Sequence, residues 1–372
     1  MKNRNKSGFG AFVAFILLVI IATLITLIVI SSMNSRTLKE TLIDISGKIQ
    51  VGVSNIQNYI NGKNENLSVV PDNIEFPEEE DLTGAQRYYY YQQLSYTAKK
   101  MYVAIENNVD KMKNGEDNIP LPPSLNEDAK SNPDGKQYIA KEFQNAWDAF
   151  VTDKSEYFYI DSSKVCLVTK ITTTGSTTDY EFFIGKGNNE NYLIDEFKNK
   201  EEVDYAIKEI EQIKTEISKN ATGNNYEKIK YVHDWLINNV KYDTSKGENT
   251  ANIYGCLVKK SAICEGYSRG FKYLLDELEI PCVLVSGTAV DEDGKSERHA
   301  WNYVYIKNNW YAIDITWDDP IIIGNGKVDE SVKYKYFLKG GKTIKKDHFE
   351  TNQITKGGYS FKYPELSEED IK

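Results

Sequence analysis

The stretch that decides the fold is SAICEGYSRGFKYLLDEL, residues 261–278. Its apolar residues recur at i, i+4, i+7, i+8 and i+11, a spacing that places them on one face of a helix. They are Tyr267, Phe271, Leu274, Leu275 and Leu278. Cys264 precedes this face by one helical turn, and Pro281 closes the stretch. The pattern predicts a largely buried helix that begins close to the cysteine.

The position of Cys264 has a chemical consequence. The positive end of a helix dipole favours an anion, and a nearby imidazolium adds to that effect. Both favour the thiolate, which is the nucleophilic form of cysteine. Glu265 acts weakly in the opposite direction, because its charge has the same sign as the thiolate. Cys264 is therefore the candidate nucleophile.

A base has to come from the three histidines of the chain, which are His233, His299 and His348. We expect a structural role for His233, because it falls in an amphipathic helix. His348 lies outside the core pattern, and we expect it to be structural or exposed. His299 opens HAWNYVYI, residues 299–306, whose alternation predicts a strand. His299 is therefore the candidate base.

The return strand supplies a third group. A turn near residues 307–309 leads into WYAIDIT, residues 310–316, which we predict as strand. In a hairpin with a two-residue loop, His299 and Asp314 share a face. If Lys307-Asn308 is the loop, His299 opposes Thr316 and Asp314 is its diagonal neighbour. We expect His299 to move the proton and Asp314 to orient the imidazole, as in hydrolase triads.

Taken together, several short stretches resemble the transglutaminase-like core of bacterial membrane-linked and secreted proteins. They are YGCLV (254–258), CEGY (264–267), HAWN (299–302), WYAIDITWDDP (310–320), HDWL (233–236) and KYD (241–243). The resemblance covers about residues 226–349, and a weaker likeness reaches back to about residue 137. It implies a papain-like α+β fold, in which the cysteine starts a helix packed on an antiparallel sheet that carries the histidine and aspartate.

The same resemblance implies acyl transfer through a thioester on Cys264. Members of the family cross-link glutamine to amines, hydrolyse peptides or amides, or have lost activity. Both a transamidase or peptidase-like enzyme and a catalytically silent interaction module therefore stay open. The oxyanion would be held by the Cys264 N–H and one upstream donor, for which Tyr254 is a candidate. No cofactor is expected, and no metal, because the histidines and cysteines show no ligand-like spacing.

An uncharged apolar run at residues 9–30 predicts a single transmembrane anchor. As a helix it spans about 33 Å, which matches a bilayer core of about 30 Å. The apolar part of a secretory signal peptide would be shorter and would end in a small-residue cleavage site. Lys2, Arg4 and Lys6 precede the run, so residues 1–8 are expected in the cytoplasm and the remainder outside the cell membrane.

The formal net charge of −10 argues against nucleic acid and against docking on anionic lipid. We expect a protein or peptide substrate, which includes cell-envelope peptides. The sequence indicates neither the substrate itself nor the oligomeric state.

The rest of the chain divides by composition into four segments. We expect a stalk and linker at 31–85, a helical and small α+β accessory region at 86–220, the catalytic domain at 221–350 and a tail at 351–372. Helices are predicted at 86–112, 137–151, 201–218 and 226–240, and a break at 114–134. Strands are predicted at 157–160, 164–173 and 179–184. The four consecutive tyrosines at 88–91 point around a whole helix, so we expect them to pack into neighbouring elements.

The four cysteines do not form a dense disulfide framework. Cys166 and Cys282 sit in apolar runs typical of strands and are expected to be buried thiols. Cys256 either stays free or pairs with Cys264, which would silence the latter.

Overall fold

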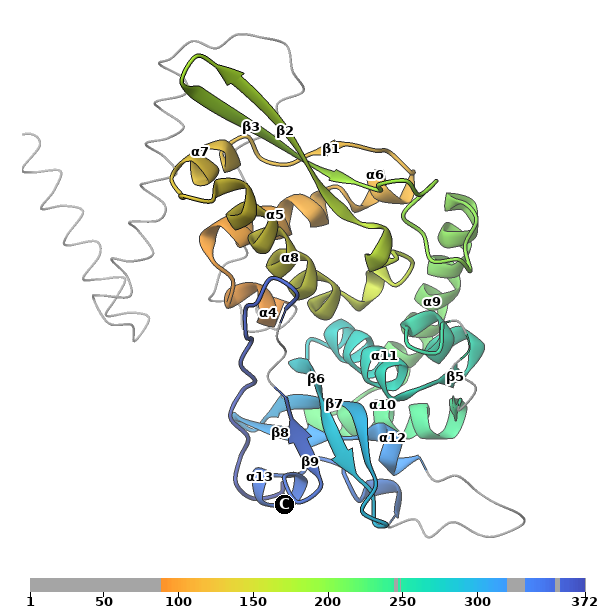
Figure 1. Cartoon of the computed structure of the whole chain (residues 1–372). Helices are drawn as coiled ribbons and strands as arrows, with labels where there is room; N and C mark the ends of the chain where they lie inside the picture. The colour runs from red at the N-terminus through yellow and green to blue at the C-terminus, as the bar shows by residue number, and fades with distance from the viewer. Residues whose placement is uncertain (1–87, 244–246, 248, 320–331, 352–354, 372) are drawn as a thin grey trace, which may run out of the picture. The chain divides into compact units, whose positions relative to one another are not determined.

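The computed structural model describes residues 88–371, apart from residues 244–246, 248, 320–331 and 352–354 (Figure 1). The described residues belong to one compact unit of mixed helices and sheets, so this part of the chain is α+β. The predicted anchor at residues 9–30 and the stalk at 31–85 lie outside these ranges. Within them, no helix is both long and apolar enough to cross a membrane.

The region before the core is mainly helical. Its helices are α4 (Tyr89–Gln92), α5 (Tyr96–Asn107), α6 (Val109–Lys113), α7 (Leu125–Lys130) and α8 (Gly135–Asp153). The helix predicted at 137–151 is thus confirmed, but the one at 86–112 is divided. Ser95 accepts a hydrogen bond from the Ala98 N–H, and such a cap starts a new helix. The predicted break at 114–134 contains α7 and the short strand β1 (Ile119–Pro120).

The tyrosine run joins this region to the core. Tyr90 and Tyr91 are buried, and their backbone N–H groups donate to the two oxygens of Asp153 at 3.0 and 2.9 Å. Burial raises the pKa of Asp153 to about 7. The Tyr90 hydroxyl donates to the backbone oxygen of Leu284. The expectation that these tyrosines pack into neighbouring elements is confirmed.

A hairpin extends from the accessory region. It consists of β2 (Cys166–Thr174) and β3 (Thr177–Gly185), which confirms the strands predicted at 164–173 and 179–184. The two strands extend further toward each other than predicted, with Thr174 paired to Thr177. The strand predicted at 157–160 is wrong. The 3-10 turn η2 (Ser155–Tyr157) leads instead into aromatic packing, in which Phe158 stacks on Tyr254 with ring centroids 5.9 Å apart. Aromatic residues are common in strands because they fit a half-buried surface. Here the same side chains pack from a loop, so their presence alone did not indicate a strand.

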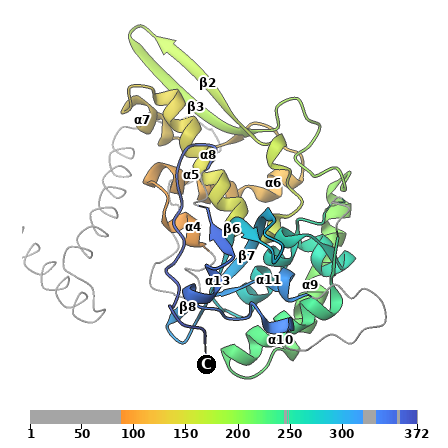
Figure 2. The same ribbon diagram turned by 60° about the horizontal axis from the view of Figure 1, so that its bottom comes forward.

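Two long helices lead into the core, α9 (Lys200–Asn220) and α10 (Asn225–Asn239), close to the predicted bounds. Asn224 and Glu227 form a capping box that starts α10 directly after the turn. Both helices pack against α11 (Cys264–Glu277), as Figure 2 shows.

The core is α11 on an antiparallel sheet of order β8-β7-β6-β9. The strands are β6 (Cys282–Val290), β7 (Ser296–Ile306), β8 (Asn309–Ile313) and β9 (His348–Glu350). The predicted apolar face of α11 packs on β6 and β7, and Tyr267, Phe271 and Leu275 are fully buried there. The local pattern of residues 261–278 therefore predicts both the helix and its buried face.

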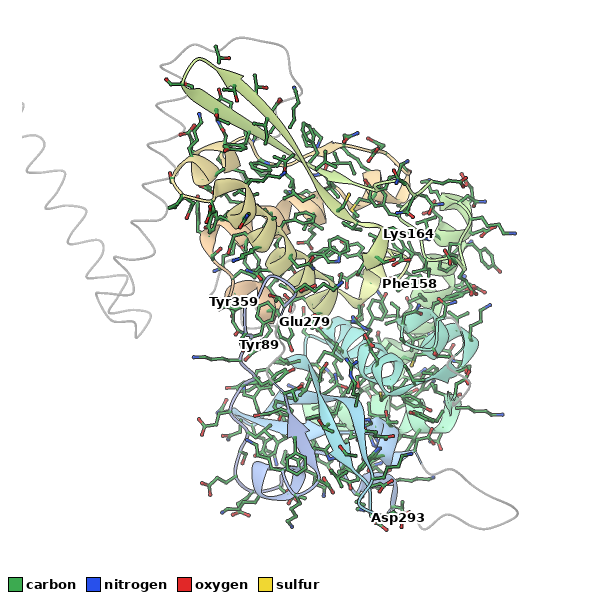
Figure 3. All side chains as sticks on the ribbon, viewed as in Figure 1. Tyr89, Phe158, Lys164, Glu279, Asp293 and Tyr359 are labelled. Atoms are coloured by element: carbon green, nitrogen blue, oxygen red, sulfur yellow. The ribbon has the colours of Figure 1, made fainter. Side chains whose placement is uncertain are left out.

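After β9 the chain returns to α4. The Tyr89 hydroxyl donates to the backbone oxygen of Lys362 at 2.9 Å, and the Tyr359 hydroxyl donates to that of Gln93 at 2.5 Å. Figure 3 shows Tyr89 and Tyr359 close together, well away from Asp293 in the turn between β6 and β7. The first described helix and the last part of the chain therefore pack on each other.

Candidate active site

Cys264 is the first residue of α11 and is half-buried. The chain enters the helix through Ile263, whose N–H donates to the Thr250 backbone oxygen at 2.9 Å. The N–H of Cys264 itself has no acceptor within the helix, because it lies in the first turn. Glu265 pairs with Arg269 at 2.9 Å. The like charge beside the thiol is thus offset by a guanidinium.

His299 lies in β7 opposite Gly287 of β6, and only 5% of its surface is exposed. Its Nε2 lies 2.7 Å from Asp314 Oδ2, and the ring lies close enough to the Cys264 thiol for that group to raise the pKa of His299. Because Asp314 occupies Nε2, Nδ1 is the nitrogen left to face the sulfur. The structure therefore brings the three predicted residues together in the order thiol, imidazole, carboxylate.

Asp314 reaches His299 by a route that differs from the prediction. The strand predicted at 310–316 ends at Ile313, and Asp314 is the N-cap of the short helix α12 (Ile315–Asp318). Its Oδ1 accepts the N–H groups of Thr316 at 3.0 Å and Trp317 at 3.3 Å. The capping preference of aspartate thus prevails over the strand pattern.

The hairpin register is the one considered for a Lys307-Asn308 loop. Ile306 pairs with Asn309, and both loop residues have positive φ, 51° and 62°. Two successive positive φ values are typical of the tight turns that match strand twist.

His299 and Asp314 each stabilise the charged form of the other. Burial alone would lower the pKa of His299, but Asp314 and the Cys264 thiol outweigh it and raise that pKa to about 10. Burial would raise the pKa of Asp314, but His299 and His348 outweigh it and hold that pKa well below its usual range. An imidazolium on His299 facing an ionised Asp314 is therefore the stable arrangement.

His348 is a member of this cluster that the sequence did not indicate. It is buried, in agreement with one of the two expectations for it, and its Nε2 lies 2.9 Å from Asp314 Oδ2. That is the same oxygen that His299 contacts. The residue comes from β9, which pairs with β6 across a long stretch of chain, so no local spacing could have revealed the contact.

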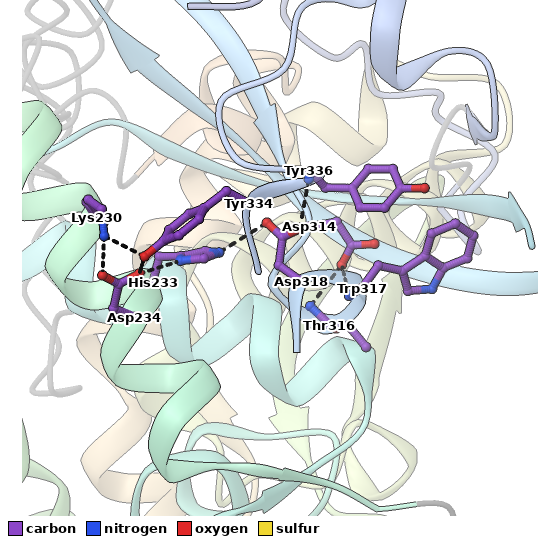
Figure 4. A network of polar contacts seen from close by, with 9 residues as sticks. All are labelled: Lys230, His233, Asp234, Asp314, Thr316, Trp317, Asp318, Tyr334 and Tyr336. Carbon is purple, nitrogen blue, oxygen red and sulfur yellow. Dashed lines mark hydrogen bonds and ion pairs between the residues drawn. The ribbon is translucent and has the colours of Figure 1, made fainter. Parts of the chain in front are cut away.

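His233 makes a second, parallel contact to α12 (Figure 4). Its Nε2 lies 3.1 Å from Asp318 Oδ2, and both side chains are fully buried. Asp318 Oδ1 accepts the Tyr336 N–H at 2.8 Å, and burial raises the pKa of Asp318 to about 6. Asp234 links the other side of His233 to Lys230 and Tyr334. The contacts are those of a structural residue, and all three histidines of the chain converge on α12.

Part of the chain is similar to known proteins. Residues 211–315 match the family model of the Transglutaminase-like superfamily. This segment resembles a transglutaminase-like core. It contains Cys264, His299 and Asp314, whereas His348 lies beyond the matched residues.

Two curated relatives are similar to about a third of this chain. The kyphoscoliosis peptidases of Mus musculus and Homo sapiens are 26% and 25% identical over 146 residues, which is 34% of this chain. The chain spans about a fifth (21%) of the length of these relatives. A crystal structure of a TGase aligns with 45% of this chain and 48% of that chain, at 17% identity and a TM-score of 0.28.

The other cysteines of the chain are free thiols. Cys256 is fully buried, and burial raises its pKa to about 12. Cys282 is buried as expected, whereas Cys166 is only half-buried and donates to the Gly185 backbone oxygen at 3.2 Å. The alternative of a disulfide between Cys256 and Cys264 is not what the structure contains.

Tyr254 does not fit the role of oxyanion donor considered for it. Its hydroxyl donates to Glu209 of α9 at 3.3 Å, and Lys259 lies over its ring. Tyr242, in the short strand β4 (Lys241–Tyr242), is instead close to the site. Burial and the charges of Cys264, Glu297 and Asp314 raise the pKa of Tyr242. Tyr242 belongs to the KYD stretch of the family resemblance, but no local pattern links this stretch to Cys264.

His299, Asp314 and His348 are also potential metal ligands, because their ligand atoms lie within 4.8 Å of one another. Two of the spacings are 2.7 and 2.9 Å, which are hydrogen-bond distances. Donors around a tetrahedral zinc ion sit about 3.3 Å apart, so the three would have to separate to hold one.

Proposed function

We propose that this protein is a thiol enzyme of transglutaminase-like type that transfers an acyl group through a thioester on Cys264. The observation that carries the proposal is the placement of His299 between the Cys264 thiol and Asp314, 2.7 Å from the carboxylate. A thiol, an imidazole and a carboxylate in this order are the parts that activate a nucleophile and return its proton.

The steps follow from the positions of the groups. Nδ1 of His299 already holds the proton of the Cys264 thiol, and the thiolate sulfur bonds to the carbon of a substrate amide. The resulting oxyanion is stabilised by the free N–H of Cys264. When the intermediate collapses, His299 donates its proton to the leaving nitrogen and the thioester remains. Water or a primary amine then attacks the thioester, loses its proton to His299 and releases Cys264.

Tyr242 is the second oxyanion donor in this proposal. It lies close enough to Cys264 and Asp314 for their charges to raise its pKa, so its hydroxyl stays protonated and able to donate. Phenylalanine at position 242 removes the donor and keeps the ring. We expect Tyr242→Phe to lower turnover by about 10²-fold while leaving the rate of Cys264 alkylation unchanged.

The proposed substrates are proteins or cell-envelope peptides outside the membrane. The apolar run at residues 9–30, with three cations before it, supports an extracytoplasmic catalytic domain held by an N-terminal anchor. The relatives are named peptidases, which supports hydrolysis beside amine transfer.

Iodoacetamide labelling at pH 6 tests the proposal, because the half-buried Cys166 provides an ordinary reference thiol in the same chain. We expect Cys264 to label much faster than Cys166 and to lose that advantage in His299→Ala. Equal labelling of the two thiols, with no effect of His299→Ala, would favour a silent interaction module and reject the enzyme.

A second assay separates the two reactions. Candidate envelope proteins are incubated with the enzyme and a labelled primary amine, with Cys264→Ala as the control. Incorporation that depends on Cys264 indicates transamidation, and cleavage without incorporation indicates hydrolysis.

A further inference from the structure

His348 occupies an unusual position for a residue outside the matched core. Asp314 Oδ2 receives His299 from β7 and His348 from β9, the two strands that flank β6. The other nitrogen of His348, Nδ1, lies 2.7 Å from Asp347 Oδ1. The side chain of His348 is fully buried. It therefore lies between two carboxylates with no access to solvent.

The contacts define the charge on His348. A neutral imidazole has one N–H donor and one acceptor nitrogen, and a carboxylate oxygen only accepts. Both ring nitrogens of His348 face carboxylate oxygens, so both contacts are hydrogen bonds only if both nitrogens carry protons. The ring also lies among aromatic rings, with centroid distances of 4.7 Å to Trp317, 5.0 Å to Tyr336 and 5.2 Å to Trp301.

The titratable groups around His348 come from several elements. Asp314 belongs to the cap of α12, Asp347 precedes β9, and His299 belongs to β7 with its ring centroid 5.6 Å away. The Tyr336 hydroxyl donates to Asp347 Oδ2 at 2.9 Å. Two carboxylates thus face two imidazoles, and the Cys264 thiol lies on the other side of His299.

Positioning of Asp314 does not need His348. Oδ1 of Asp314 is already fixed by the Thr316 and Trp317 N–H groups, and Oδ2 is fixed by His299. What His348 can add is a positive charge beside Asp314 Oδ2, the oxygen that His299 also contacts.

We propose that His348 is a charge-sharing positioning residue, whose imidazolium shares the Asp314 carboxylate with His299 and so limits how firmly His299 keeps its proton. The effect of His348 on catalysis rests on the function proposed above. A buried, unshared Asp314 would stabilise the His299 imidazolium strongly, and an acid held that firmly donates poorly to a leaving amine. Sharing the carboxylate leaves His299 protonated yet able to release the proton.

The charge on His348 is testable without any enzymatic activity. The chain has three histidines, so ¹⁵N-histidine labelling of the full-length Cys264→Ala protein gives three resolvable ring systems. We expect both His348 nitrogens to carry protons, since each faces a carboxylate oxygen. In His348→Gln, which keeps an N–H donor and removes the charge, the deprotonation midpoint of His299 should rise by about one pH unit.

Two variants serve as controls for that measurement. His348→Phe preserves the aromatic packing, and it should raise the His299 midpoint in the same direction. His233→Gln makes the same chemical change on the Asp318 side of α12, and it should leave the midpoint where it is. A neutral His348 at pH 7, or an unmoved His299 midpoint in both His348 variants, would overturn the proposal.

The catalytic consequence has its own readout in the enzyme with Cys264 intact. An amide needs a proton from His299 as its nitrogen leaves, whereas an activated ester does not. His348→Gln should therefore slow amide turnover by about tenfold and ester turnover by less than about twofold, with KM unchanged for both. Equal losses on the two substrates would mean that His348 is merely structural. If the protein turns over neither substrate, the proposed function fails while the nitrogen-15 measurement still decides the charge on His348.

Discussion

Asn302 donates from Nδ2 to the backbone oxygen of Ser268 over 3.1 Å, and both residues are buried. Asn302 follows His299 by three positions on β7, and Ser268 follows Cys264 by four on α11. One hydrogen bond between the strand and the helix therefore fixes how the imidazole lies relative to the thiol.

Replacing Asn302 by leucine keeps most of the volume and leaves the Ser268 oxygen buried without this donor. We expect the free energy of unfolding to fall by about 1–3 kcal/mol and Cys264 to alkylate more slowly. Urea denaturation and iodoacetamide labelling measure the two effects. The exposed Asn309 provides the control, since Asn309→Leu should change the unfolding free energy by less than about 0.5 kcal/mol.

Asp314→Asn removes the charge that orients and supports His299. Turnover should fall by about 10³- to 10⁴-fold, measured by steady-state kinetics on whichever amide substrate the enzyme accepts. A loss below about tenfold would assign the orienting role to another group.

The pKa shifts of His299 and Asp314 also predict that the stability lost in Asp314→Asn varies with pH. The pKa of His299 is raised from 6.5 to about 10, so its contribution is complete below pH 6.5 and is lost as the pH rises through 10. The pKa of Asp314 is lowered, so its contribution is present above about pH 4 and is lost as the pH falls below that. The stability difference between wild type and Asp314→Asn should be largest between about pH 4 and 6.5 and shrink toward pH 10. Urea denaturation at pH 5, 7 and 9 checks this, and a difference independent of pH would contradict it.

In the network of His233, Asp318, Asp234 and Lys230, the buried contacts should contribute more to the free energy of unfolding than the exposed ones. Asp318→Ala leaves both the His233 Nε2 and the Tyr336 N–H without their acceptor, at a cost of about 3–5 kcal/mol. Lys230→Met removes the partly exposed ion pair with Asp234 and should cost less than about 1 kcal/mol. Thermal unfolding of the two variants compares them, and equal losses would show that burial does not set the energetics of this network.

Gly270 is required by a close approach between α11 and Cys256. A Cβ at position 270 would lie 2.6 Å from the Cys256 Sγ. Gly270→Ala should therefore destabilise the fold by about 1–3 kcal/mol despite the better helix propensity of alanine. The double variant Gly270→Ala with Cys256→Ala removes the sulfur and should recover most of the loss in a denaturation cycle. No recovery would place the cost elsewhere on the helix.

The elements that sequence alone predicted well are those whose signal is local. The apolar face after Cys264 predicts α11, and the parity of a short hairpin places His299 and Asp314 on one side. Where two local preferences competed, the prediction was wrong. The alternation at residues 310–316 suggested a strand throughout, but the tendency of Asp314 to cap a helix ends the strand at Ile313.

The contacts of the short strand β9 could not be predicted from the sequence. The β9 strand has three residues and pairs with β6 at Gly287, Thr288 and Ala289. A segment this short has no periodicity to read, and its partner lies about sixty residues earlier in the chain. Local patterns therefore do not indicate His348, although the sheet brings it to the Asp314 oxygen that His299 also contacts.

The packing of Cys256 behind α11 also determines how the protein would respond to oxidants. Cys256 contacts Gly270, which lies six residues, or about 9 Å, along the helix from Cys264. Cys282 is buried in β6, and Cys166 hydrogen bonds within its own hairpin. A sulfenic acid formed on Cys264 would thus lack an internal thiol in the folded chain to convert it to a disulfide. Recovery would depend on a small thiol or a reductase from outside the molecule, and without one, oxidation would proceed to the irreversible sulfinic acid.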